Sequence, residues 1–179
     1  DSREKGQEIY IQVGHNAMES LNHKEVLDSL KHFAEEKIKI FLPLSYGNDN
    51  DKYATEVAEY AEKLFPGKIM ALKDFMKADE YFELMKRIDI AIFDTQRQCG
   101  LGNINRMVCR NVKLYMPKDS VMYKYFRENG VPIQDCNDIE NLSFQEFISD
   151  FEITDQEEFN KFILHFSDMS AKVEKWRNI

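Results

Sequence analysis

The chain has 179 residues and a formal net charge of −8 at neutral pH. This length suits one domain with a sizeable core, and a content of 43% hydrophobic and 31% charged residues is typical of a globular protein. The acidic balance argues against a sequence-independent nucleic-acid-binding protein, because such proteins neutralise phosphates with a surplus of lysine and arginine. An anionic ligand would therefore need a local positive site.

The three cysteines Cys99, Cys109 and Cys136 are an odd number at wide spacing, which fits neither a disulfide framework nor a zinc motif. We therefore expect the protein to reside in the reducing cytosol and to bind neither a metal ion nor a cofactor. No apolar run approaches the roughly 18 residues needed to span a bilayer, so the protein is expected to be soluble, or peripheral on a membrane at most. The chain opens with Asp1 and its first strand follows almost at once, so we expect it to be part of a longer protein.

Strands and helices are predicted to alternate over the first part of the chain. The helix that starts at His23 has an apolar face, and Asn22 is expected to cap its first turn through its side chain. Alternation of this kind predicts a Rossmann-like parallel sheet with helices on both faces and right-handed crossovers. The predicted strands are residues 8–13, 37–44, 68–72, 88–93, 112–116 and, more weakly, 132–135, and the predicted helices are 23–36, 51–65, 77–87, one between 103 and 112, and 120–130.

The pattern after Asp138 is helical only, with predicted segments at 143–151, 154–166 and 169–179. These helices are expected to cover the sheet or to contact a neighbouring domain, with Trp176 as an anchor. No repeat or Pro/Gly-rich linker divides the chain. We therefore expect a single domain over residues 1–179, with an α/β core at about 8–140 and a helical tail at 141–179.

Three predicted strands end in loops rich in small and polar residues: GHNAMESLN (14–22), LSYGNDND (44–51) and DTQRQCGLGN (94–103). Ligands bind at this edge of an open α/β sheet, and a helix N-terminus offers free amides and a partial positive charge. Gly100 and Gly102 would let the backbone approach a phosphate, and Arg97 could add a charge-assisted contact. We interpret the third loop as a diphosphate cradle, although a glycine pair can merely form a tight turn. It matches neither the dinucleotide nor the P-loop motif.

Other residues in these loops have both a functional and a structural interpretation. His15 is a candidate for chemistry, although lone histidines, His23 included, are more often surface or capping residues. Asp94 is expected to form a turn or cap, or else to ligate Mg²⁺. Cys99 has no obvious base nearby, which favours a packing role over a nucleophilic one. Tyr46 either stacks on a base or is a plain loop residue.

The segments IQVGHNA, NH at a helix start, IFLPLSYG, DIAIFDTQRQCGLGN and VKLYM, followed by GVPI, occur in this order. From about Ile9 to Ile139, the chain resembles the C-terminal half of bacterial 4-acetamido-4,6-dideoxy-galactosyltransferases, the fucosamine transferases of enterobacterial common antigen synthesis. The resemblance implies the C-terminal domain of a two-domain GT-B glycosyltransferase that holds a dTDP-linked 4-acetamido sugar. It also implies an undecaprenyl-diphosphate-linked acceptor at the inner face of the cytoplasmic membrane, engaged by an N-terminal domain outside this sequence. The fragment alone would be inactive.

The resemblance also implies roles for individual loop residues. Arg97 and His15 would be the catalytic candidates, in a metal-independent transfer in which Arg97 and backbone dipoles stabilise the departing nucleoside diphosphate. Cys99 replaces an expected glutamine, which leaves selectivity for the donor sugar open. Gly14, His15 and Asn16 would lie near the donor diphosphate, Tyr46 and Gly47 near the nucleoside, and Arg97, Gln98, Gly100, Leu101, Gly102 and Asn103 around phosphate and sugar.

Two kinds of alternative stay open. One is another nucleotide-sugar enzyme of GT-B type, such as an epimerase or a transferase with a UDP donor. The other is a non-catalytic flavodoxin-like interaction module. A receiver-type domain would need clustered acidic residues after the first strand and an aspartate at the end of the third strand. This chain has GHN after the first strand and ALKD at the third, which argues against a receiver-type domain.

Overall fold

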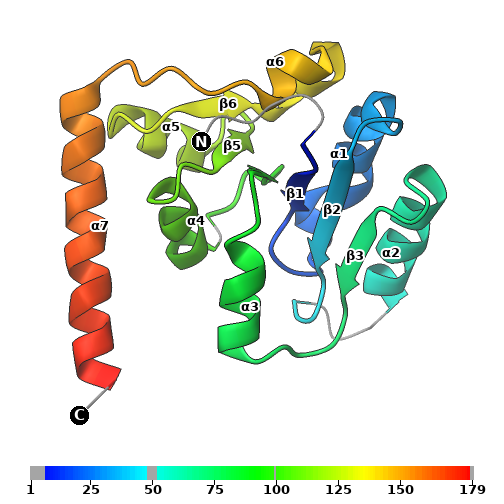
Figure 1. Ribbon diagram of the computed structural model, residues 1–179, viewed down its shortest axis with the longest axis horizontal. Coiled ribbons are helices and arrows are strands. Elements are labelled where there is room, and N and C mark those ends of the chain that lie inside the picture. The colour runs from blue at the N-terminus through cyan, green and yellow to red at the C-terminus, as the bar shows by residue number, and fades with distance from the viewer. Residues whose placement is uncertain (1–6, 48–51, 99, 178–179) are drawn as a thin grey trace.

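A six-stranded, all-parallel sheet forms the centre of the protein, in the strand order β3-β2-β1-β4-β5-β6 (Figure 1). The computed structural model describes residues 7–47, 52–98 and 100–177. The order reverses between β1 and β4, which is where open α/β sheets bind ligands. The strands are β1 (Ile9–Val13), β2 (Ile38–Pro43), β3 (Ile69–Leu72), β4 (Ile90–Ile92), β5 (Lys113–Met116) and β6 (Ile133–Asp135).

The central strands are buried on both sides, which explains their continuous apolar sequences. Every residue of β4 and β5 is buried. Ile11 of β1 aligns with Ile40 of β2 on one side and with Ile90 of β4 on the other. Strands covered on both faces need apolar side chains at consecutive positions rather than the alternation of a half-exposed sheet.

Helices cover both faces of the sheet, as predicted. Leu27, Val57 and Phe147 belong to the core on one face, and Met107 and Phe126 to the core on the other. The first face carries α1 (His23–Leu30), α2 (Lys52–Leu64) and α6 (Phe144–Ile148), and the second carries α3 (Ala78–Met85), α4 (Leu101–Val108), α5 (Val121–Glu128) and α7 (Gln156–Arg177). Short 3₁₀ segments, η1 (Glu19–Leu21), η2 (Lys31–Phe33) and η3 (Cys136–Asn141), complete the domain.

The C-terminal tail is helical, but its division differs from the prediction. The two last predicted segments form one helix, α7, which runs along the outside of the domain (Figure 1). Its N-terminal half packs on α5, with the rings of Phe126 and Phe162 5.8 Å apart. The side chain of Trp176 lies outside the described residues.

The expected side-chain cap at Asn22 is wrong. Asn22 adopts a left-handed backbone with φ of 46°, and its amide Nδ2 donates to Asp94 Oδ2 at 3.2 Å. A capping residue has an extended backbone and turns its side-chain oxygen to the first amides of the helix, whereas the left-handed Asn22 directs its amide to Asp94. Among the described residues, none of the helices has the length and apolar character needed to cross a lipid bilayer.

Candidate functional site

The loops that follow β1, β2 and β4 meet at the carboxyl edge of the sheet. The Gly14 amide donates to the Ile92 carbonyl at 2.9 Å, and the Ala17 amide donates to the Tyr46 carbonyl at 2.7 Å. The His15 ring lies beside Gly100, so that a Cβ atom on this glycine would be 3.3 Å from His15 Cδ2. The structure therefore brings together the first and third predicted loops at the reversal point of the strand order.

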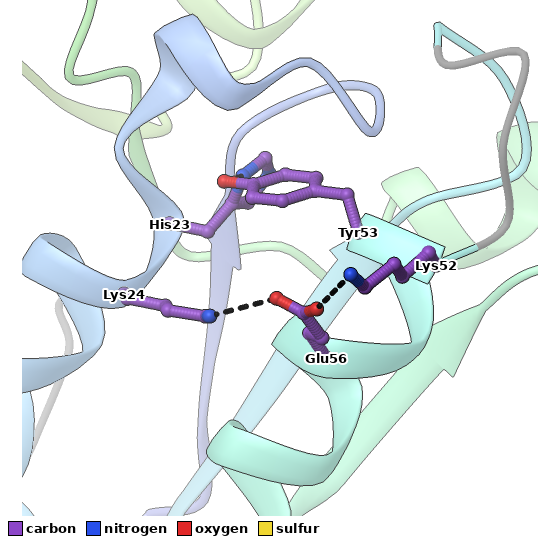
Figure 2. Close-up of polar contacts among 5 residues, drawn as sticks. All are labelled: His23, Lys24, Lys52, Tyr53 and Glu56. Carbon is purple, nitrogen blue, oxygen red and sulfur yellow. Dashed lines mark hydrogen bonds and ion pairs between the residues drawn. The ribbon is translucent and has the colours of Figure 1, made fainter.

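The turn at Gly14 rests on a buried histidine. Gly14 has a φ of +67°, and a Cβ atom there would lie 2.5 Å from His23 Nε2. His23 has no exposed surface, and its Nδ1 lies 3.1 Å from the Tyr53 hydroxyl (Figure 2). Burial, with a smaller contribution from neighbouring His15, lowers the pKa of His23 to about 4. The expectation of a surface or capping role for His23 is therefore wrong.

His15 is also buried, and its hydrogen bonds define its tautomer. The Asn16 Oδ1 atom accepts from the Met18 amide at 3.0 Å, so Asn16 Nδ2 faces His15 Nε2, 3.2 Å away. Because an amide nitrogen can only donate, Nε2 must accept, and the ring proton resides on Nδ1. Burial lowers the pKa of His15, which keeps the ring neutral near pH 7. Nδ1 has no hydrogen-bond partner among the described residues and is itself buried, so it could donate to a ligand only after a shift of the turn exposes it.

The loop after β2 packs on the same turn. A Cβ atom on Gly47 would lie 2.9 Å from Asn16 Cγ, so a side chain at this position would displace the amide that orients His15. Tyr46, beside it, is 55% exposed. The loop therefore contributes a close backbone contact to the site and an aromatic side chain at its rim.

Helix α4 begins at the same place with a bare first turn. Gly100 is left-handed, with φ of 57°, and its carbonyl accepts from the amides of Asn103 and Ile104. The preceding amides, those of Leu101 and Gly102, lie at the end of the helix where no intrahelical acceptor exists. A Cβ atom on Gly102 would meet no described atom within 4 Å, so packing does not explain this glycine. The arrangement suits an anion at the helix N-terminus.

The rest of the third loop is more exposed. Arg97 and Gln98 are exposed, and the Arg97 amide donates to Thr95 Oγ1 at 3.2 Å. Gln96 Nε2 donates to Asp119 Oδ1 at 2.9 Å, which ties the loop to the one after β5. No contact between described residues joins Arg97 or Gln98 to the His15 turn, and Cys99 lies outside the described residues.

Asp94 links the loops instead of forming a cap or turn. It accepts from Asn22 Nδ2 at 3.2 Å and from Cys136 Sγ at 3.8 Å, and burial raises the pKa of both Asp94 and Cys136.

Within the described parts of the chain, no three His, Cys, Asp or Glu side chains form a group that could hold a metal ion. A cavity of about 240 Å³ beside Asp94 is lined by Glu25, Val26, Ser29, Ile92, Asp94, Cys136, Asn137, Ile139 and Glu140.

The contact between the buried His23 and the partly buried Tyr53 was not predicted from the sequence. One signal was present: Tyr53 stands four residues before Val57 and eight before Ala61, two apolar residues that recur at helical spacing within the predicted helix 51–65. This spacing predicts a tyrosine turned toward the core, where its hydroxyl needs a partner.

Several solved glycosyltransferase structures share this fold. The C-terminal domain of LpcC, a glycosyl transferase group 1 family protein from Francisella tularensis, matches with a TM-score of 0.59 and 9% identity, over 92% of this chain and 85% of that one. The catalytic domain of cholesterol-α-glucosyltransferase from Helicobacter pylori matches with a TM-score of 0.56 and 12% identity, over 93% and 99%. The α,α-trehalose-phosphate synthase (UDP-forming) from Burkholderia vietnamiensis matches with a TM-score of 0.58 and 10% identity, over 97% of this chain but only 46% of that one. At these identities the similarity concerns the fold, which is that of GT-B C-terminal domains.

The sequence itself matches a family model over residues 1–178. The description of this family is 4-alpha-L-fucosyltransferase, glycosyl transferase group 56. Because the match spans nearly the whole chain, the protein belongs to the 4-alpha-L-fucosyltransferase family of glycosyltransferases, group 56.

Proposed function

We propose that this domain binds the donor of a fucosamine-type glycosyltransferase, a dTDP-linked 4-acetamido-dideoxy sugar. The observation that carries the proposal is the contact between the His15 turn and Gly100 at the start of α4. It puts the carbon edge of the buried His15 ring beside a helix N-terminus at the reversal point of the sheet. Helix N-termini at such points are suited to hold phosphate groups.

The proposed chemistry is the departure of the nucleoside diphosphate. As the bond between the sugar carbon and the diphosphate oxygen breaks, negative charge grows on that oxygen. The amides of Leu101 and Gly102, His15 Nδ1–H and the Arg97 guanidinium would stabilise this charge. The neutral His15, with Nε2 engaged by Asn16, would act as a hydrogen-bond donor rather than as the base for the acceptor hydroxyl.

The remaining assignments follow the arrangement of the loops. Gly14 and Asn16 would shape the diphosphate site, while Tyr46 and Gly47 would flank the nucleoside. Gln98 and Asn103 would contact phosphate or sugar. Asn103 stands in the first turn of α4, and the other residues stand in the three loops at the carboxyl edge of the sheet.

The acceptor would be a lipid-linked saccharide of cell-envelope polysaccharide synthesis, such as that of enterobacterial common antigen. It would bind through an N-terminal domain, at the cytoplasmic face of the bacterial inner membrane. The two-domain arrangement is supported by the GT-B fold and by this chain spanning 46% of a trehalose-phosphate synthase.

Isothermal calorimetry with dTDP and UDP tests the donor assignment. We expect dTDP to bind more tightly, whereas preferential UDP binding would favour another nucleotide-sugar enzyme, an epimerase or a UDP-dependent transferase. Absence of binding to either nucleotide would favour a non-catalytic flavodoxin-like module.

Arg97→Ala in the full-length enzyme tests the catalytic assignment. We expect turnover to fall about 100-fold to 1000-fold, because the variant lacks one donor to the leaving group. Arg106→Ala is the matched control, since this exposed arginine stands later in α4 with its guanidinium 4.7 Å from the Phe82 ring centroid. Equal activity of the Arg97 variant and wild type would remove Arg97 from the mechanism.

A further inference from the structure

The Gly14 turn is connected to helix α2 through the buried His23 and the partly buried Tyr53. Tyr53 is the second residue of α2, and His23 is the first residue of α1. We infer that Tyr53 is a positioning residue of the donor site, which acts through His23 to hold the Gly14–Asn16 turn in its binding conformation. This inference rests on the proposed function.

The geometry joins the two rings edge to face. Their centroids are 5.8 Å apart, and the Tyr53 hydroxyl lies 3.1 Å from His23 Nδ1 (Figure 2). Burial raises the pKa of Tyr53 to about 12, while the His23 backbone, acting as a hydrogen-bond partner, opposes this rise. The hydroxyl therefore keeps its proton at neutral pH. We assign this hydroxyl as the donor to Nδ1, which places the proton of the neutral His23 ring on Nε2.

The opposite edge of the His23 ring supports the turn. Nε2 occupies the space where Gly14 would carry a Cβ atom, 2.5 Å from that position. A rotation of the ring would therefore press on the Gly14 backbone, because the ring is fully buried and already lies against this residue. His15 follows Gly14 directly and lies against Gly100, so a shift of the turn would carry its imidazole away from the start of α4.

A second contact between the same two helices provides a matched control. Glu56 of α2 lies 3.2 Å from Lys24 Nζ and 3.8 Å from Lys52 Nζ (Figure 2). These ion pairs are partly exposed and do not touch the Gly14 turn. Exposed ion pairs contribute little to stability. Glu56→Gln loses the pair with Lys24, which joins α1 to α2, and the pair with Lys52, which lies within α2, without changing the support of the turn.

The experiment compares Tyr53→Phe with Glu56→Gln by calorimetric titration with dTDP. Tyr53→Phe removes one oxygen atom and keeps the ring. We expect its affinity for dTDP to fall about tenfold, as for the loss of one buried hydrogen bond that orients the site, and that of Glu56→Gln to stay within about twofold of wild type. Thermal melting of both variants shows whether they remain folded.

A ¹⁵N NMR spectrum of the histidine side chains gives the readout that separates positioning from general stability. In the wild type, His15 is expected as one tautomer with its proton on Nδ1. In Tyr53→Phe, we expect mixed tautomers or exchange broadening at His15, and in Glu56→Gln the wild-type spectrum.

The outcomes distinguish failure of the positioning role of Tyr53 from failure of the proposed function. Unchanged dTDP affinity and an unchanged His15 spectrum in Tyr53→Phe would overturn the positioning role and leave the proposed function intact. Loss of affinity only through loss of folding would also overturn it. A wild-type protein that does not bind dTDP would overturn the proposed function, and the positioning role with it.

Discussion

The ring of His15 packs against Gly100, which joins the loop after β1 to the start of α4. Gly100 has a φ of +57°, and a Cβ atom there would come within 3.3 Å of His15 Cδ2. We predict that Gly100→Ala destabilises the fold by about 1–2 kcal/mol through backbone strain and also displaces His15. Denaturant unfolding measures the first effect, and dTDP titration measures the second.

Gly67→Ala is the control for this substitution. Gly67 has a similar φ of +70°, but a Cβ atom there would meet no described atom within 4 Å. Gly67→Ala should destabilise the fold by a similar amount through backbone strain, and its affinity for dTDP should stay within about twofold of wild type. Equal dTDP affinity in the two variants would show that the contact between His15 and Gly100 does not shape the site.

The sequence was sufficient to predict the parallel sheet and the edge at which its polar loops lie; the site itself stays a prediction. Apolar runs separated by amphipathic segments predict parallel strands, and the loops that carry His15 and Gly100 then fall at the carboxyl edge. Helix α7 was predicted in two pieces, although residues 154–177 contain no proline or glycine that would end a helix between them.

The side-chain contacts beneath the loops were not predictable in the same way. Asn22 binds Asp94, and His23 meets Tyr53, across 72 and 30 positions of sequence. Such pairs depend on how distant elements pack, whereas periodicity reports only which face of one element is buried. A local rule therefore gave Asn22 a capping role that the tertiary bond replaced.

Gly102 offers a test in which stability and binding change in opposite directions. A Cβ atom at this position in α4 would meet open space among the described residues. Gly102→Ala should therefore stabilise the protein, by up to about 1 kcal/mol, because alanine has less chain entropy to lose in a helix. The added methyl group would cover the bare helix start and weaken dTDP binding. A variant with raised stability and undiminished dTDP affinity would place the phosphates elsewhere.

The buried His23 predicts a loss of stability in mild acid. Its pKa is about 4 in the folded protein, against 6.5 for an unperturbed histidine. Between these values, the unfolded chain binds a proton that the folded protein does not, so stability falls as the pH falls through this window. At about 1.4 kcal/mol per pH unit, the difference reaches about 3 kcal/mol near pH 4.

Unfolding free energies of wild type and His23→Gln, measured between pH 7 and pH 4, test this prediction. The stability advantage of wild type at pH 7 should shrink by about 3 kcal/mol at pH 4. His32→Gln, at an exposed position, controls for the loss of a histidine as such. A constant difference across this range would mean that His23 takes up a proton in the folded state.

Lys113 connects strand β5 to the end of helix α6, and its removal should be costly. This lysine is only 4% exposed, and its Nζ atom donates to the carbonyls of Glu146 at 3.0 Å, Phe147 at 2.9 Å and Ser149 at 3.0 Å. Lys113→Met has a similar shape but leaves these carbonyls without the ammonium, so we predict a destabilisation of about 3 kcal/mol.

Lys118→Met provides the comparison, because Lys118 is exposed in the loop after the same strand and should change stability by less than about 0.5 kcal/mol. Denaturant unfolding of both variants measures the difference. If Lys113→Met were as stable as wild type, water would have to replace the ammonium at the end of α6. Helix α6 would then be held on β5 by the Tyr115 hydroxyl, which donates to the Phe147 carbonyl at 3.3 Å, and by the stacking of Phe147 on Tyr115, whose ring centroids are 5.4 Å apart.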